Sequence, residues 1–199
     1  MEAARHIEGF RHGRVPREVR ERQLVELGEQ LFAERGFAKA SMDELARRAG
    51  VTKPVIYELF QSKEGLFRAC LEALALRLAE QIADAARAED EPEARLRAGG
   101  LAFLRFASEN RVAYELLYEG RFSDAAVSVR RRQAALILEL MREIAPAGVD
   151  PRELEVAAHA VNSAYEGVAH WMWEHPDVSV ERLADWTVEL LLPGLRRFT

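Results

Sequence analysis

The sequence predicts an all-α protein, and three observations carry this prediction. Apolar residues recur at every third or fourth position along most of the chain, whereas segments with the alternating pattern of a β-strand are absent. Residues that begin and end helices separate these segments at helix-length intervals. Apolar residues make up 49% and charged residues 31% of the 199 residues, a composition that excludes global disorder and supports a packed core.

The first two helices have clear start and stop signals. Leucines at helical spacing predict a helix over residues 17–35, and Gly36 is expected to end it in the left-handed conformation. Ser41-Met42-Asp43-Glu44 matches a capping box, in which the serine hydroxyl binds the amide of residue 44 and the glutamate reaches back. The short helix that follows is expected to end at Gly50.

Seven further helices bring the predicted number to nine. Thr52 is the expected cap of a second short helix, and Ser62 the cap of a long one that runs to about residue 87. The others are predicted over residues 93–109, 110–118, 123–144 and 151–174, and from Ser179 to Pro193-Gly194.

The two short helices have the arrangement of a helix-turn-helix. They follow a longer helix and are joined at Gly50-Val51, so the N-terminal end of the second one is placed to enter the major groove of duplex DNA. Spacing alone leaves a generic helical hairpin as the alternative.

Further residues distinguish these possibilities. The segment VTKPVIYELFQSKEGL (51–66), with its lead-in over residues 36–50, resembles the TetR-like family of transcriptional regulators, and the resemblance covers residues 17–66. It implies a nine-helix architecture with an N-terminal arm over residues 1–15, a helix-turn-helix DNA-binding domain over 16–65 and an effector-binding and dimerisation domain over 66–199. It also implies a repressor that a small-molecule effector releases from its operator.

The resemblance assigns DNA contacts residue by residue. Lys53 can meet a phosphate or a guanine edge, Val55 a thymine methyl and Tyr57 a phosphate. The full predicted set is Ser41, Thr52, Lys53, Val55, Tyr57 and Lys63. Pro54 and Val55 stand where many relatives carry Gly and Thr. Glu58 would repel phosphates unless it turns away or pairs with Arg47 or Arg48.

The charge distribution is compatible with this assignment. The first 65 residues carry 12 Lys and Arg against 11 Asp and Glu, whereas the remaining 134 carry an excess of acidic residues that brings the net charge to −5. Binding to phosphates depends on where the positive residues lie rather than on the total. Arg5, Arg11 and Arg14 form either an arm that reaches the DNA or a disordered leader.

The C-terminal part is expected to bind an effector and a second copy of the chain. The residues predicted to line the effector cavity, with plain core as the alternative, are Phe103, Phe106, Tyr114, Leu117, Tyr118, Phe122, His159, Asn162, Glu166, His170 and Trp173. Glu115, Glu119 and Glu166 near aromatic residues hint at a cationic lipophilic effector. The resemblance implies a homodimer formed by the last two long helices, reading a pseudo-palindromic operator. Their expected contacts are Ala157, Val161, Ala164 and Val168, with Trp186, Leu190 and Leu191; intramolecular core is the alternative.

Other classes of protein have weaker support. An all-α hydrolase using Glu166 and His170 would need a nucleophile paired with a base, and no such spacing or phosphate loop occurs. The same two residues with His159 are too few for zinc, so no metal or cofactor is expected. A helical adaptor protein is the third alternative. The single Cys70, the absence of a secretory signal and the absence of a membrane-length apolar run suggest a cytoplasmic protein.

Overall fold

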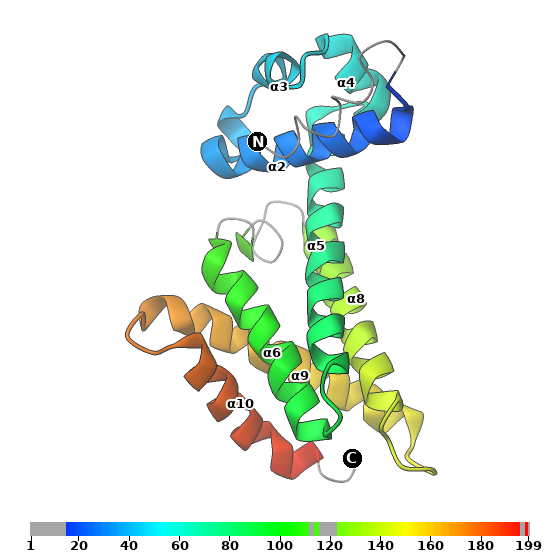
Figure 1. The fold of residues 1–199 in the computed structure, drawn as a ribbon, viewed down its shortest axis with the longest axis vertical. Helices are drawn as coiled ribbons and strands as arrows, with labels where there is room; N and C mark the ends of the chain where they lie inside the picture. Colours follow the sequence, from blue (N-terminus) through cyan, green and yellow to red (C-terminus); the bar gives the residue numbers. More distant parts are fainter. Residues whose placement is uncertain (1–14, 112–113, 116–122, 196–197, 199) are drawn as a thin grey trace. The chain divides into compact units, whose positions relative to one another are not determined.

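The computed structural model of the chain describes residues 15–111, 114–115, 123–195 and 198. Over these residues it contains eight helices and no strand, which confirms the all-α prediction (Figure 1). The helices are α2 (Arg17–Lys39), α3 (Met42–Ala49), α4 (Lys53–Phe60), α5 (Lys63–Arg87), α6 (Pro92–Glu109), α8 (Ser123–Arg142), α9 (Pro151–Glu174) and α10 (Val180–Leu195). Most of the short helix expected over 110–118 lies outside the described residues.

The chain forms two compact units, Met1–Leu74 and Ala75–Thr199. The division between them falls within α5, whereas the sequence places a domain boundary after residue 65; that boundary stays a prediction.

The N-terminal unit is built on side chains that α2 to α5 direct to a common core. Leu24, Leu31, Leu45, Ile56 and Leu66 are fully buried, and they come from all four helices. The ring of Phe67 lies 4.9 Å from those of both Phe32 and Phe37, which closes this core at one end. Burial of apolar side chains from four short or medium helices is therefore what fixes their mutual angles.

Glycines end the helices of this unit as predicted. Gly36 has φ 69° and breaks the helical geometry inside α2, and Gly50 has φ 64° at the turn between α3 and α4. Ser62 also behaves as predicted, since its hydroxyl accepts the amide of Gly65 at 3.0 Å.

Two predicted caps are wrong in detail. Ser41 accepts the amide of Asp43 at 3.3 Å rather than that of Glu44, because the Glu44 carboxylate turns to Arg48 and does not reach back. The hydroxyl of Thr52 caps nothing, because the backbone carbonyl of this residue itself accepts the amide of Val55 at 3.1 Å.

Gln61 holds a backbone conformation that favours glycine. It has φ 67° and ψ −40°, and the amide of Ser62 donates to the carbonyl of Phe60 across it at 2.7 Å, so these residues form a tight γ-turn between α4 and α5. A side chain in this region costs about 1–3 kcal/mol.

Replacing this residue by glycine is therefore expected to stabilise the chain. Gln61→Gly should raise the free energy of unfolding by about 1 kcal/mol after the entropic cost of glycine is subtracted. Gln30→Gly, the same change at an exposed helical position, should lower it by about the same amount. Chemical denaturation measures both, and equal destabilisation by the two changes would show that the turn at Gln61 is unstrained.

The C-terminal unit packs the rest of α5 with four other helices. In it α9 contacts α6, α8 and α10, and α10 also packs on α6. The predicted cap Asp150 is confirmed, since its carboxylate accepts the amide of Arg152 at 2.9 Å. The predicted end at Pro193-Gly194 is wrong, because α10 continues to Leu195. The proline is tolerated there since Pro193 and Glu189, whose carbonyl loses its helical partner, are both exposed.

Candidate nucleic-acid interface and effector cavity

The helix α4 presents a polar face to solvent and an apolar face to the core. Ile56 is fully buried and anchors the helix, whereas the neighbouring Tyr57 is 38% exposed. Thr52 is exposed, and Lys53 and Val55 are half-buried. The helix is therefore fixed to the core by its buried side, while its N-terminal end and Tyr57 remain accessible to solvent.

Lys53 is held in place by α3. Its Nζ lies 2.9 Å from the Oδ2 of Asp43, and this hydrogen bond, with the charge of the carboxylate, raises the pKa of Lys53. The pair is exposed, so it contributes little to stability and is readily exchanged for a phosphate.

Lys63 is positioned by the end of α2. Its Nζ donates to the carbonyl of Ala38 at 3.2 Å and lies 4.8 Å from the centre of the Phe37 ring. These contacts restrict the ammonium group to the start of α5. The structure thus places Ser41, Thr52, Lys53, Val55, Tyr57 and Lys63 within one compact unit.

A network of charges that the sequence analysis missed ties α2 to α3. Both terminal nitrogens of Arg48 donate to the carboxylate of Glu34, at 3.0 and 2.7 Å, and one also pairs with Glu44. The guanidinium lowers the pKa of both carboxyls, chiefly by hydrogen bonding. The spacing of Glu44 and Arg48 on one helix was a detectable signal, but Glu34 is distant in the sequence.

Among the described residues Glu58 forms an ion pair with neither Arg47 nor Arg48, and Arg48 is engaged with Glu34 and Glu44 instead. The side chain of Glu58 is exposed, and its charge adds to the hydrogen bond of Glu21 in raising the pKa of Arg17.

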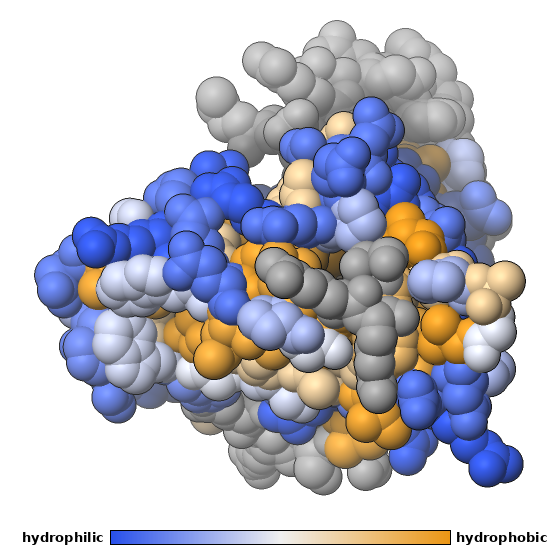
Figure 2. Space-filling model, turned by 90° about the horizontal axis from the view of Figure 1, so that it is seen from below, coloured by the Kyte–Doolittle hydropathy of each residue, from blue (hydrophilic) through white to orange (hydrophobic). Residues whose placement is uncertain are grey.

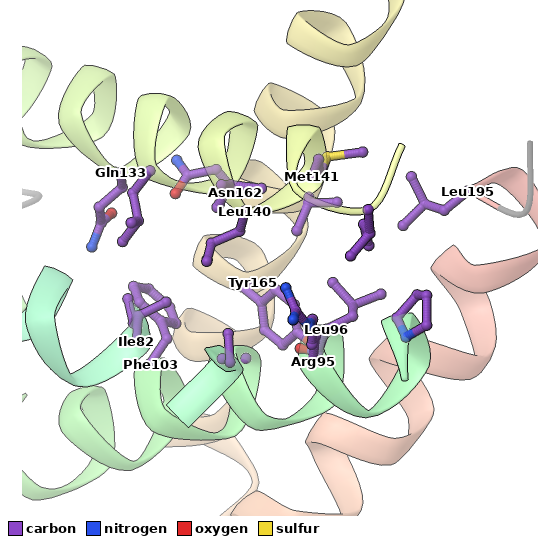
Figure 3. Close-up of a pocket in the computed structure, with 18 of the residues that line it drawn as sticks. Ile82, Arg95, Leu96, Phe103, Gln133, Leu140, Met141, Asn162, Tyr165 and Leu195 are labelled. Carbon is purple, nitrogen blue, oxygen red and sulfur yellow. The ribbon is translucent and has the colours of Figure 1, made fainter. Parts of the chain in front are cut away.

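The C-terminal unit encloses a cavity of about 100 Å³ between α5, α6, α8, α9 and α10. Figure 3 shows Gln133 and Leu140 reaching from α8 toward α6, with Met141 further along α8. Ile82 and Phe103 lie at the same end as Gln133, and Leu195 from α10 lies at the opposite end with Met141 (Figure 3). Nearly all of the wall is apolar.

Three polar side chains of the wall form hydrogen bonds or an ion pair with other groups of the protein. The amide of Asn162 donates to Glu166 at 2.7 Å, and the hydroxyl of Tyr165 donates to the carbonyl of Leu96 at 3.4 Å. Arg95 pairs with Glu143 at 3.0 Å. Burial raises the pKa of Tyr165, so this phenol stays neutral.

Two of the residues predicted to line the cavity do line it, Phe103 and Asn162. Glu166 instead pairs with Arg130 at 2.9 Å, and His159 is exposed. Leu117, Tyr118 and Phe122 lie outside the described residues. The predicted effector contacts as a set stay predictions.

Other predicted residues form an aromatic cluster. The rings of Tyr114 and Trp173 are 5.0 Å apart, His170 lies 5.6 Å from Tyr114, and Phe103 connects the cluster to the cavity at 5.9 Å. Phe106 is buried but is not part of the cavity wall. The sequence analysis missed Tyr165, since nothing in its helical spacing distinguishes a wall residue from plain core.

The last two helices also carry exposed apolar side chains. Val156 and Trp171 on α9 are 70% and 40% exposed, and Trp186 and Leu190 on α10 are 45% and 78% exposed. The predicted contacts Ala157 and Val161 are instead buried within their own unit, so the alternative of intramolecular core is correct for them.

Comparison with known proteins decides the family. The profile described as "Bacterial regulatory proteins, tetR family" matches residues 24–70, and "Tetracyclin repressor-like, C-terminal domain" matches residues 92–194. The chain belongs to the TetR family of transcriptional regulators. A TetR-like transcriptional regulator from Rhodococcus sp. RHA1 is 31% identical with a TM-score of 0.64, over 92% of this chain and 99% of that one.

Two other matches differ in how much of this chain they resemble. The HTH-type transcriptional activator FasR of Mycolicibacterium smegmatis is 38% identical over 115 residues, so the match covers 57% of this chain and about half (52%) of that protein. The regulator FadR from Bacillus subtilis, solved in complex with stearoyl-CoA, is 15% identical with a TM-score of 0.68, over 87% and 98% of the two chains. This second likeness shows the fold.

The predicted function, that of a TetR-family transcriptional regulator, is confirmed. The chain is a DNA-binding transcriptional regulator, and TetR regulators are typically repressors with a ligand-binding C-terminal domain that act as dimers. In the described part of the chain, no helix combines the length and apolar character needed to cross a membrane.

Proposed function

We propose that this regulator binds a pseudo-palindromic operator as a homodimer, represses transcription there, and leaves the DNA when an apolar small molecule fills the cavity. The observation that carries the proposal is the geometry of α4: Ile56 buries one side of the helix, while Tyr57 is exposed and the Lys53 ammonium is held in an exposed pair with Asp43. A helix held in this way is suited to dock its N-terminal end into a major groove.

The DNA contacts follow from the accessible groups. The ammonium of Lys53 exchanges the exposed carboxylate of Asp43 for a phosphate or a guanine edge. Tyr57 donates its hydroxyl to a phosphate, and Lys63 binds a phosphate from the flank of the helix pair. Ser41, Thr52 and Val55 have short side chains and complete the set of DNA contacts. Of these, Val55 packs against a thymine methyl.

The effector is assigned from the chemistry of the cavity wall. Because Arg95, Asn162 and Tyr165 are bonded to protein groups, the surface offered to a ligand is chiefly apolar. An elongated apolar chain matches it, and the acyl chain of the stearoyl-CoA that the Bacillus subtilis regulator of this fold binds supports this class. A cationic effector has less support, since Glu166 is paired with Arg130 and Asn162.

Release from DNA requires that the effector bind one conformation of the dimer more tightly than the other. Its leverage equals this difference in affinity, so a ligand that fills the cavity only when the two DNA-binding units are misaligned with the operator lowers DNA affinity. We assign the protein to the cytoplasm, where its DNA target lies, and infer that it acts by binding rather than by catalysis, without a metal or cofactor.

The contacts of the two lysines are tested by the salt dependence of DNA binding. An operator is first obtained by selecting bound sequences from random duplexes. Lys63→Ala should then weaken binding and lower the slope of log affinity against log salt by about 2, from one phosphate in each subunit of a dimer. Lys53→Ala should weaken binding too, with the same loss of slope if it meets a phosphate and a smaller one if it meets a base.

The matched control is Arg142→Ala, which removes one exposed positive charge from the C-terminal unit. Its affinity and slope should stay close to those of the wild type. If both lysine variants also keep the wild-type affinity and slope, the proposed DNA interface is wrong.

A further inference from the structure

The effector cavity has two ends of different construction. At one end Ile82, Phe103 and Gln133 come from the interior of long helices (Figure 3). The opposite end, marked by Met141 and Leu195, includes Phe198, three residues beyond the last residue of α10. A side chain beyond the last residue of α10 therefore forms part of the cavity wall.

Phe198 is firmly placed by its neighbours. It is 3% exposed and belongs to a buried apolar cluster with Leu154 and Ala157 of α9, against which Met141 and Leu195 also pack. The last two of these side chains line the cavity themselves, so the cluster and the cavity share a wall. Figure 2, which views the molecule from below, shows several apolar patches on this face with polar side chains around them.

We propose that Phe198 closes this end of the cavity and thereby sets the greatest length of apolar ligand that the regulator accepts. The proposal rests on the proposed function, since it takes the cavity to be the effector site. A linear chain lying between α6 and α8 gains affinity with each methylene that it buries, until its tip meets the phenyl ring. Beyond that length an added methylene stays in water or forces the ring out of its cluster.

The other residues of this end are less suited to such a role. Met141 and Leu195 are carried by helices, so their backbones are fixed by helical hydrogen bonds. Met141 is also unbranched and adapts to its surroundings, which makes it a poor stop. Phe198 follows the end of α10 and presents a rigid ring, so exchanging it alters the length of the cavity with the least effect on the helices.

The test uses the full-length protein and uncharged ligands. The fluorescent apolar probe N-phenyl-1-naphthylamine is bound first, and 1-alkanols of increasing length displace it. In the wild type, affinity should rise about fourfold with each added methylene and then level off at one chain length. Phe198→Ala should move this plateau to longer alkanols by about two carbons, because the phenyl ring is removed. Phe198→Trp should move it to shorter ones.

Opposite shifts separate a length stop from general destabilisation, which would weaken all alkanols alike in both variants. Should Phe198→Ala fail to fold, the shift expected for Phe198→Trp carries the test. Val188→Ala, a buried change on α10 that is not part of the cavity wall, should leave the plateau where it is. If both Phe198 variants bind alkanols with the wild-type plateau, the role of Phe198 as a length stop is wrong, whereas the proposed effector site still stands. A wild-type protein that binds neither probe nor alkanols would instead overturn the proposed effector site.

Discussion

Replacing Val156 and Leu190 together by Glu is expected to give a monomer that binds its operator at least ~100-fold more weakly than the wild type. These two side chains are the most exposed large apolar residues on the last two helices, at 70% and 78%. In a homodimer built on α9 and α10 they are buried, and burial of each contributes about 1.5–3 kcal/mol. Two carboxylates in each subunit remove this term and add repulsion. One helix-turn-helix alone makes too few contacts for tight specific binding.

Sedimentation measures the oligomeric state, and fluorescence anisotropy with a labelled operator measures affinity. The matched control is Leu76→Glu, which introduces the same charge at an exposed leucine of α5, 58% accessible. This variant should remain a dimer with wild-type affinity. A double variant that still sediments as a dimer would mean that the subunits associate through another surface.

The composition of the exposed face of α9 supports this interface. Ala160, Ser163 and Gly167 lie between Val156 and Trp171 and are all exposed. Small side chains in such a row let a partner helix approach closely, while the large residues at either end supply apolar area. The predicted stripe of Ala157 and Val161 is displaced from this face, because these residues point into the cluster and the cavity of their own unit.

Much of the fold could be predicted because its signals are local. Gly36 and Gly50 need positive φ, and Asp150 caps the amide two residues on, so each marks a helix end without reference to the rest of the chain. The errors at Thr52 and Pro193 have the opposite origin. Whether a hydroxyl or a backbone carbonyl accepts an amide, and whether a proline sits on an exposed last turn, depends on three-dimensional context.

The two candidate sites differ in how many of their residues could be predicted from the sequence. The candidate DNA interface lies in a short continuous segment, so which side of α4 is buried, with Ile56, and which is exposed, with Tyr57, follows from helical periodicity. The cavity is assembled from five helices, and whether a given apolar residue faces it depends on the angles at which they pack. Phe103 could be found as an aromatic residue near Phe106 on one helix, and Asn162 as a member of a set at regular helical spacing, whereas Gly100 was not predicted to line the cavity.

Gly100→Ala is expected to weaken effector binding at least ~10-fold while leaving DNA binding intact. A Cβ at this position would lie 2.0 Å from Cζ of Tyr165 and 2.1 Å from its hydroxyl oxygen, far inside contact distance. The Tyr165 ring is 4% exposed and forms part of the cavity wall, so it can yield only by moving into the cavity or disturbing α9. Overpacking of this kind costs about 1–3 kcal/mol. We expect at least tenfold weaker binding of N-phenyl-1-naphthylamine and a repressor that stays on its operator.

The neighbouring glycine provides the control. A Cβ at Gly99 would meet Ile82 at 3.5 Å and Ala86 at 3.6 Å, which are ordinary contacts, so Gly99→Ala should be neutral or more stable by up to about 1 kcal/mol from helix propensity. Thermal denaturation and probe titration compare the two variants directly. Because both changes add one methyl to the same helix, only the approach of Tyr165 distinguishes them. Equal stability and equal probe affinity would show that the close packing of Gly100 on Tyr165 does not control the cavity.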